Sequence, residues 1–339
     1  MSMGPIQLRS SLHETIWGGE NLRVFAGKDV PPGKRIGESW ETALDAVATN
    51  PPYAGQTLGA LTEHYGVALI GARAQAVFGA RFPLLTKFID AQAQLSVQIH
   101  PNDEYAATHE GDKLGKTEVW HILHAEPGAQ VVYGLSHAAT EDEVRQAIAA
   151  NTLEDLLRSV EVRPGDVIFV PAGTVHAIGA GVVLYELQEY SDITYRLYDY
   201  GRLQADGRPR DLHIEQGLAV MRYAPHEMER VAPLERDGRR ILVGCRYFLL
   251  EEVLLAGELA GTIRPNSCQI ITVLAGQCAI TSPAGNVTLG HGETAVLPAS
   301  LGAHTLDGRD TRILRAWVPD SDDADLAAWR AAQPYPIED

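Results

Sequence analysis

Hydrophobic positions along the chain come in short runs that glycine and proline interrupt. Runs of about four to eight apolar residues between turn residues are typical of β-strands. Examples lie at 82–85, 95–100, 119–123, 167–170, 182–187, 270–274 and 294–297. Because many short strands at close spacing favour a β-sandwich or barrel, the pattern predicts a mainly β protein.

Two stretches depart from this pattern and predict α-helical segments inserted between the strands. Residues 58–78 are rich in alanine and leucine, which favour helix. In 140–160, Thr140 and Glu143 fit a capping box at a helix start. The stretch continues with an apolar stripe made by Val144, Ile148, Leu153, Leu156 and Leu157.

A weak internal repeat indicates two similar units in one chain. Residues 163–176 and 290–304 both contain a glycine turn, an apolar strand, a Pro-Ala turn and a later histidine, His176 or His304. The spacing to the histidine differs by one residue. We interpret the repeat as two jelly rolls in tandem, of which the first carries the chemistry.

The predicted boundaries follow from this repeat and from a charged, proline-containing stretch at 224–240, the candidate linker. The first barrel, with the catalytic site, is expected to span 1–235. The second barrel, at 240–319, is expected to be metal-free, because His304 has no upstream Gln-x-His or His-x-His partner. An acidic tail, 320–339, follows and is expected to contain a short helix around 325–332.

Length and charge restrict the possible partners. The 339 residues suffice for two domains, and the formal net charge is −16. Nucleic acid and anionic membranes are excluded as partners, because both need basic patches that this sequence lacks. An anionic small molecule remains possible, since a few converging Arg and Lys side chains suffice to bind it.

The cysteines and the expected lack of a signal peptide or transmembrane helix indicate the cellular compartment of the protein. The three cysteines form no C-x-x-C pair and no disulfide framework, which favours a reducing compartment. No signal peptide is expected at the N-terminus, and no run of about 18 apolar residues predicts a transmembrane helix. We therefore expect a cytoplasmic protein, as a monomer or weak homo-oligomer.

Candidate chemistry begins in the segment 95–101. Alternation along a strand places Ser96, Gln98 and His100 on one face, and Pro101 ends the strand. Three polar groups on one face of an apolar strand are costly to bury without partners. Glu118 lies in a following run of strand-forming residues, and a hairpin return would bring it near His100.

The third piece of this site is a Gly-x5-Pro-x-Gly-x2-His motif that ends at His176 and fits the second cupin motif. With Gln98, His100 and Glu118, it offers two imidazoles, one carboxylate and one amide oxygen. Zinc or another divalent first-row metal accepts such a set of nitrogen and oxygen ligands. The sequence therefore predicts one metal site, with open positions for substrate.

A polar strand follows in the segment 182–202. Alternation there predicts one face that is formed by Asp192, Thr194, Arg196, Tyr198 and Tyr200. Such a density of tyrosine and charge suits the wall of a polar pocket. An exposed edge strand with cross-strand pairs would show the same sequence pattern.

Six sequence blocks make the chain similar to a known family, the type I phosphomannose isomerases of the short bacterial kind. The blocks are WGG at 17–19, GESWE at 37–41, PLLTKFIDA at 83–91, LSVQIHPNDEYA at 95–106, LGKTEVWHIL at 114–123 and PAGTVHAIGAGVVLYELQEYSDITYRLYDYGR at 171–202. They span the first two-thirds of the chain. The large helical insertion of the longer relatives is missing.

The resemblance implies a fold and a set of functional residues. The fold would be tandem cupin barrels. Zinc would be bound by Gln98, His100, Glu118 and His176, and Arg196 would have the catalytic role. The residues expected to bind substrate are Trp17, Glu38, Lys87, Ser96, Lys116 and Glu189.

The reaction implied by the resemblance interconverts mannose 6-phosphate and fructose 6-phosphate through a cis-enediol(ate). A metal would stabilise the charge that develops on oxygen, and a base must carry the proton between C2 and C1. The sequence leaves four candidates for this base: Glu189, Glu186, Lys116 and a metal-bound water. The cations available for the phosphate are Lys87, Lys113, Lys116 and Arg202.

Three other functions remain open at this point. The same chemistry on another hexose or hexose phosphate would use the same site. A cupin dioxygenase would use a redox iron and usually an His-x-His first motif, whereas this chain has Gln-x-His. A non-enzymatic sugar-binding cupin would lack the metal set or Arg196, and both are present.

Overall fold

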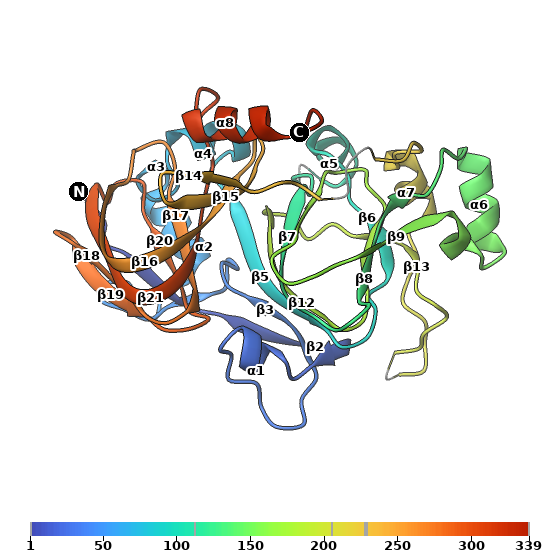
Figure 1. Cartoon of the computed structure of the whole chain (residues 1–339), viewed down its shortest axis with the longest axis horizontal. Coiled ribbons are helices and arrows are strands. Elements are labelled where there is room, and N and C mark those ends of the chain that lie inside the picture. The colour runs from blue at the N-terminus through green and yellow to red at the C-terminus, as the bar shows by residue number, and fades with distance from the viewer. Residues whose placement is uncertain (1, 112, 205, 227–229, 338–339) are drawn as a thin grey trace.

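The computed structural model describes residues 2–111, 113–204, 206–226 and 230–337, and it is mainly β (Figure 1). Its strands form a six-stranded, a five-stranded and a ten-stranded sheet, and the paired strands of the described residues run antiparallel. The predicted fold class is therefore confirmed. Among the described residues, no helix has the length and apolar character that crossing a membrane requires.

The first barrel is built from the two smaller sheets. The six-stranded sheet has the order β10 (Val167–Val170), β7 (Glu118–Ala125), β12 (Val182–Glu189), β5 (Leu84–Ala91), β3 (Ile36–Trp40) and β2 (Ser11–Gly19). The five-stranded sheet has the order β13 (Tyr195–Tyr198), β6 (Val97–Ile99), β11 (His176–Ile178), β8 (Gln130–Leu135) and β9 (Leu157–Glu161). An apolar cluster that includes Trp120, Ile168, Tyr133 and Ile178 fills the space between the two sheets.

The ten-stranded sheet forms the second barrel. Its main path is β14 (Leu234–Arg236), β15 (Arg239–Gly244), β16 (Leu249–Thr262), β21 (Ala303–Trp317), β17 (Gln269–Ala275), β20 (Thr294–Leu297), β1 (Ile6–Arg9) and β4 (Val47–Ala48). The hairpin of β18 (Cys278–Ser282) and β19 (Gly285–Leu289) joins it through β21. Its interior holds a separate apolar cluster that includes Val253, Ile271 and Ile313.

The N-terminal strand belongs to this second sheet. Ile6 of β1 pairs with Val296 of β20, and Leu8 pairs with Ala48 of β4. The predicted boundary near residue 235 assigns these segments to the first barrel, so the sheet crosses the expected division. No strand is predicted at 6–9 from the sequence, and β1 pairs with strands that lie far from it in the chain.

The two barrels pack through the outer face of the six-stranded sheet. Tyr185 Oη lies 3.4 Å from Thr272 Oγ1, and the rings of Phe169 and Phe248 meet edge to face at 6.3 Å. One apolar cluster contains buried residues of both barrels. The barrels therefore share a core instead of meeting at a polar surface.

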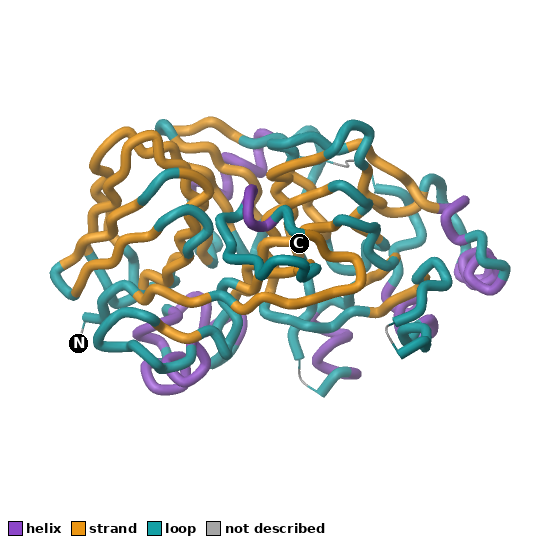
Figure 2. Tube along the Cα trace, turned by 90° about the horizontal axis from the view of Figure 1, so that it is seen from below, coloured by secondary structure: helices purple, strands orange, loops and turns teal. Residues whose placement is uncertain are grey.

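The helices lie at the edges of the strands (Figure 2). The predicted helix at 58–78 is three short helices, α2 (Leu58–Tyr65), α3 (Val67–Ile70) and α4 (Ala72–Phe78). The breaks fall at Gly66 and Gly71, whose positive φ values of 48° and 95° end a right-handed helix. Shorter helices are α1 (Leu22–Phe25), α5 (Asp103–His109) and α7 (Ile214–Val220).

The predicted helix at 140–160 is too long. Helix α6 spans Glu141–Ala149, with the predicted capping box between Thr140 and Glu143. Asn151 then adopts a φ of 59°, a short 3₁₀ turn follows, and 157–161 form strand β9. The apolar residues Leu157 and Val160 therefore lie in a strand of the sheet and are not part of the apolar stripe of a helix. The tail contains α8 (Ala324–Ala332), close to its predicted range.

Candidate metal and substrate site

Three strands of the first barrel bring the predicted metal ligands together. Gln98 on β6 and His176 on β11 are direct partners in the five-stranded sheet. Glu118 begins β7 in the opposite sheet, and His100 follows directly after β6. His100, Glu118 and His176 are buried, and one potential ligand atom of each lies within 4.8 Å of the others.

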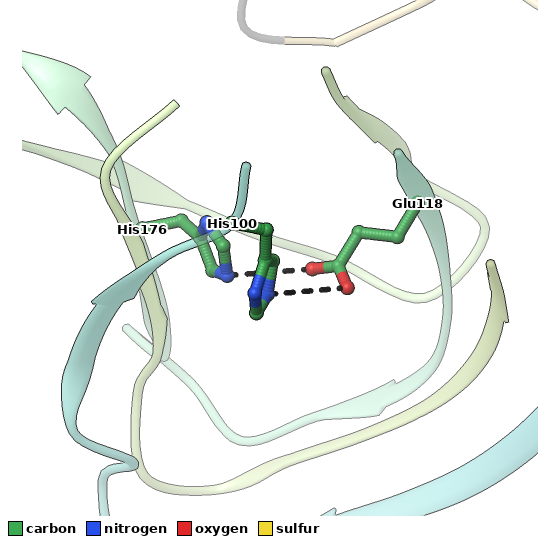
Figure 3. A group of neighbouring side chains, drawn as sticks. All are labelled: His100, Glu118 and His176. Carbon is green, nitrogen blue, oxygen red and sulfur yellow. Dashed lines mark ion pairs between the residues drawn. The ribbon is translucent and has the colours of Figure 1, made fainter. Parts of the chain in front are cut away.

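Both imidazoles face the Glu118 carboxylate (Figure 3), and backbone carbonyls fix their orientation. His100 Nδ1 donates to the Ile193 carbonyl at 2.7 Å, and His176 Nδ1 donates to the Thr174 carbonyl at 2.8 Å. The Nε2 atoms therefore carry the lone pairs that could bind a metal, and they lie 3.6 Å and 3.4 Å from the two carboxylate oxygens of Glu118. Metal-binding histidines are held in this way.

The electrostatics of the cluster also fit a cation. Burial raises the pKa of Glu118 to about 7 and lowers that of His176 to about 4. Glu118 Oε1 is buried and accepts no hydrogen bond from the described residues. Two neutral imidazoles therefore lie next to a carboxylate whose Oε1 accepts no hydrogen bond from the described residues, and a divalent ion would bind all three groups.

Gln98 stands at the edge of this cluster. Its Nε2 lies 3.4 Å from His176 Nε2, and its side chain is half-buried. A turn of the amide by 180° would present Oε1 instead, which is the atom that binds metals. The residues present thus fit the predicted set of four ligands.

Lys116 places a positive charge against the same atoms. Its Nζ lies 2.5 Å from Glu118 Oε2 and 3.1 Å from His100 Nε2. The side chain is buried, with 5% exposed. Lys116 therefore belongs to the ligand cluster and not to the rim of the pocket.

A second charged group lies on the inner face of the six-stranded sheet. Lys87 Nζ lies 3.4 Å from Glu186, 3.9 Å from Glu38 and 4.6 Å from the ring centroid of Trp40. Burial opposes charge on Lys87, but the three carboxylates Glu38, Glu186 and Glu118 outweigh it and raise its pKa.

Glu186 contacts a second residue of the barrel interior besides Lys87. It accepts from Trp120 Nε1 at 3.2 Å. Burial alone would raise the pKa of Glu186, but Lys116 and Lys87 outweigh burial and lower it. Glu186 is therefore an ionised carboxylate in the barrel interior.

Arg196 lies beside the ligand cluster. It is the strand partner of Gln98, and its Nε donates to Ser96 Oγ at 3.2 Å. Its Nη1 donates to the Asp211 carbonyl at 2.9 Å. The alternation predicted from Asp192 to Tyr200 is interrupted, because β13 covers only Tyr195–Tyr198 and its register shifts after Arg196.

Two further arginines gather near Arg196. Arg202 and Arg210 both bind the Asp199 carboxylate, at 2.5 Å from Oδ1, and their charges act on the pKa of Arg196. Asp199 is shared between two guanidinium groups, so the region carries surplus positive charge. The sequence analysis missed Arg210, which lies in a loop without a strand pattern; its proximity in sequence to Arg202 was the available signal.

Three predicted residues lie away from the ligand cluster. Trp17 is buried in the apolar cluster of the first barrel. Lys113 pairs with Asp192 at 3.0 Å, and both side chains are at least half exposed. Glu189 is buried behind the cluster, where Oε1 accepts from the Thr117 backbone N–H at 2.8 Å.

The environment of Glu189 keeps its proton on. Burial, followed by the neighbouring Asp103, raises the pKa of Glu189 well above its usual range. Asp103 itself accepts from Gly115 N at 2.9 Å and from Tyr247 Oη at 3.0 Å. This network supports the backbone on both sides of Lys116 and Glu118.

Comparisons with known proteins identify the family of the chain. The family model for the type I phosphomannose isomerase catalytic domain matches residues 6–114. The chain is 38% identical to mannose-6-phosphate isomerase ManA of Bacillus subtilis over 319 residues, which are 91% of this chain and 97% of that relative. It is 37% identical to the mannose-6-phosphate isomerase of Streptococcus mutans, covering 90% and 95% of the two chains.

Solved structures give the same picture. The crystal structure of mannose 6-phosphate isomerase from Bacillus subtilis superposes with a TM-score of 0.81 and 33% identity, covering 92% of this chain and 99% of that one. A putative mannosephosphate isomerase from Archaeoglobus fulgidus, at 21% identity and a TM-score of 0.74, shares the fold. From the sequence identity over nearly the whole of both chains, we conclude that this chain belongs to the type I phosphomannose isomerase family.

Proposed function

We propose that the protein interconverts mannose 6-phosphate and fructose 6-phosphate through a cis-enediol(ate), with one zinc ion held by Gln98, His100, Glu118 and His176. The observation that carries the proposal is the buried cluster in which both imidazole Nε2 atoms face the Glu118 carboxylate. Its family membership supports the substrate, because the relatives are named mannose-6-phosphate isomerases.

The reaction moves a proton from C2 of the aldose to C1 and shifts the carbonyl from C1 to C2. Negative charge develops on a sugar oxygen when the proton leaves, and that charge limits the rate. When bound, the metal would act as a Lewis acid that stabilises this oxygen. The residues around it must carry the proton and hold the sugar phosphate.

Glu186 is the proton carrier that the surroundings favour. It lies in the barrel interior, and Lys116 and Lys87 keep it ionised, so it is able to accept a proton. Glu189 is protonated and occupied with Thr117 N–H, which argues against it as a base. Lys116 lies against Glu118 and His100, where its positive charge would steady the developing oxyanion.

Arg196 would hold the substrate close to the metal. Arginine stays protonated in proteins, so Arg196 donates hydrogen bonds and does not act as a base. Its position beside Gln98 and Ser96 suits contact with a sugar oxygen or with the phosphate. An Arg196→Ala enzyme whose kcat/KM stays within threefold of wild type would remove this role.

The phosphate would bind near Arg202 and Arg210. These two guanidinium groups share one carboxylate, Asp199, and with Arg196 they leave the region positively charged. Guanidinium groups bind phosphate with paired hydrogen bonds. Lys87 and Lys116, by contrast, are paired with carboxylates inside the barrel, and Lys113 is paired on the surface.

The direct test is a coupled assay in which mannose 6-phosphate turnover is read as fructose 6-phosphate, before and after chelation and zinc return. Activity should fall with the metal and return with it. His176→Ala should lose stoichiometric zinc and activity together while circular dichroism still reports a folded β protein. No turnover in the zinc-loaded protein, or full turnover in a folded metal-free variant, contradicts the proposal.

A further inference from the structure

The second barrel repeats the strand pairing that builds the site in the first. In the first barrel β12 lies between β5 and β7, with Glu186 opposite Lys87 and Gln188 opposite Glu118. In the second barrel β21 lies between β16 and β17 in the same antiparallel arrangement. The two barrels therefore have corresponding positions, which can be read from the registers.

At the position that corresponds to the Glu186–Lys87 pair, these registers place another ion pair, in which the two charges are exchanged between the strands. Arg315 lies opposite Glu251, where the first barrel has Glu186 opposite Lys87. Trp317 lies opposite Gln269, so Gln269 takes the place of the metal ligand Glu118.

The same comparison shows that the second barrel lacks most of the metal ligands. His304 lies opposite Gly261, as His176 lies opposite Gln98. Of the four ligand positions, the second barrel thus keeps a histidine in one, and Gln98 and Glu118 are replaced by glycine and glutamine. Among the described residues, the only cluster of metal-ligating side chains is that of the first barrel.

A cavity of about 370 Å³ opens beside Gln269 and Arg315, the positions that correspond to Glu118 and Glu186, whereas His304 and Gly261 line a different cavity. That volume lies within the range of small-molecule sites. Strands β15, β17 and β21, the loop after β16 and the start of α8 all contribute to its wall. Its lining includes Arg239, Asn266, Gln269, Arg315, Trp317 and Asp325.

Two arginines of this cavity, Arg239 and Arg315, are already paired with carboxylates. Glu251 is fully buried and is held by Arg239 Nη1 at 2.9 Å and Arg315 Nε at 2.5 Å. Arg239 Nη2 also binds Asp325 at 3.1 Å. A phosphate would have to displace these carboxylates, and a metal cation would meet three arginines, because Arg264 also lines the cavity.

The groups left for a ligand are acceptors and an aromatic surface. Gln269 Oε1 is buried and has no hydrogen-bond partner among the described residues. Aspartates 320, 322 and 323 also line the cavity, although Asp320 Oδ2 already accepts from Asn266 and Asp323 Oδ1 already caps α8. Trp317 adds a half-buried indole, which suits the apolar face of a sugar ring.

We propose that this cavity, the second-barrel pocket, binds an uncharged polyhydroxyl compound of the size of a free hexose. Its hydroxyl groups would donate to Gln269 Oε1 and the aspartates, while its carbon skeleton lies against Trp317. The proposal is independent of the isomerase function, because no residue of the ligand cluster lines this pocket.

The test is calorimetric titration of the zinc-loaded full chain with D-mannose, D-glucose, D-fructose and D-mannitol. At least one should bind, and Gln269→Leu should weaken that binding at least tenfold while leaving mannose 6-phosphate turnover unchanged. Trp317→Ala is a second variant with the same expected result. Arg196→Ala should leave the binding unchanged, because this residue belongs to the first barrel.

Three outcomes overturn the proposal. In the first, none of the four compounds binds. In the second, binding is lost in Arg196→Ala and kept in Gln269→Leu, which assigns it to the first barrel. In the third, inorganic phosphate binds with an affinity that Gln269→Leu or Trp317→Ala reduces, which would make the pocket an anion site.

Discussion

Single hydrogen bonds decide what the buried polar residues of the first barrel can do. His100 and His176 each give one ring N–H to a backbone carbonyl, so the other nitrogen is free to bind a metal. Glu186 and Glu189 are both buried glutamates on β12, three residues apart. Lys116 and Lys87 outweigh burial and lower the pKa of Glu186, which keeps it ionised. Burial and Asp103 raise the pKa of Glu189, which keeps it protonated. Identical side chains therefore have different chemistry.

Replacement of these two glutamates separates their roles. Glu186→Gln should lower kcat by about 10²–10⁴-fold, because a general base is removed. Zinc content should stay near one per chain, and exchange of the C2 proton with solvent should stop. Kinetics, metal analysis and deuterium exchange measure these three effects.

Glu189→Gln is the matched control. Glutamine keeps an acceptor for Thr117 N–H and a donor toward Asp103, so activity should stay within several-fold of wild type. A large loss in Glu189→Gln together with full activity in Glu186→Gln would exchange the two assignments.

The arginines around Asp199 should determine the affinity for phosphorylated sugars. Arg210→Met removes one charge-assisted donor, and such hydrogen bonds contribute about 1.5–3 kcal/mol. KM for mannose 6-phosphate should therefore rise at least tenfold. Steady-state kinetics on Arg210→Met and Arg202→Met measure this.

Lys113→Met serves as the comparison variant. Its ion pair with Asp192 is exposed, and such pairs contribute about 0–1 kcal/mol. KM should stay within about twofold. The reverse result, in which Lys113→Met raises KM and Arg210→Met does not, would move the phosphate to the surface lysine.

Among the secondary-structure elements, α6 shows how local sequence sets a boundary. Thr140 Oγ1 accepts from Glu143 N at 3.3 Å, and Glu143 Oε2 accepts from Thr140 N at 2.7 Å. These bonds satisfy donors that a helix start leaves free. The helix then ends at Ala149, and the apolar residues beyond it join the sheet as β9.

Loss of this cap should loosen α6 alone. Thr140→Ala removes the accepting hydroxyl, which costs about 1 kcal/mol. Hydrogen exchange of the α6 amides should quicken about fivefold, while turnover stays the same. Thr152→Ala is the control, because Thr152 makes no side-chain cap bond to the next turn. Equal effects of the two changes would mean that the box does not hold the helix.

For the whole molecule, the contact between the barrels contains a buried histidine. His121 on β7 lies 3.7 Å from Glu252 on β16, and only 3% of it is exposed. Burial, with Arg240 and Arg312, lowers its pKa to about 4. Because the unfolded chain takes up this proton near pH 6.5, stability falls as pH drops from 6.5 toward 4.

The effect is measurable with His121→Gln. Between pH 7.5 and pH 5, wild type should lose ~2 kcal/mol more than the variant, because stability falls by up to ~1.4 kcal/mol per pH unit below pH 6.5. Urea unfolding of chelated protein at pH 7.5 and pH 5 measures this difference. Identical pH dependence of the two proteins would show that His121 takes up its proton in the folded state.

The sequence by itself determined the local features of this protein. Short apolar runs predicted the strands, and the capping box placed the start of α6. Alternation on 95–101 placed Gln98 and His100 on one face, and the cupin motif singled out His176. These features depend on residues a few positions apart, which is the range over which backbone geometry and side-chain direction act.

Tertiary structure decided what depends on distant partners. Pairing of β1 with β20 sends the N-terminus into the second barrel. Burial, together with the neighbouring Asp103, raises the pKa of Glu189. Arg210 binds Asp199 from an irregular loop, where no periodic sequence pattern indicates a functional residue. Strand partners, burial and charge contacts are set by residues far apart in sequence, so only the folded chain fixes which carboxylates ionise and which arginines meet.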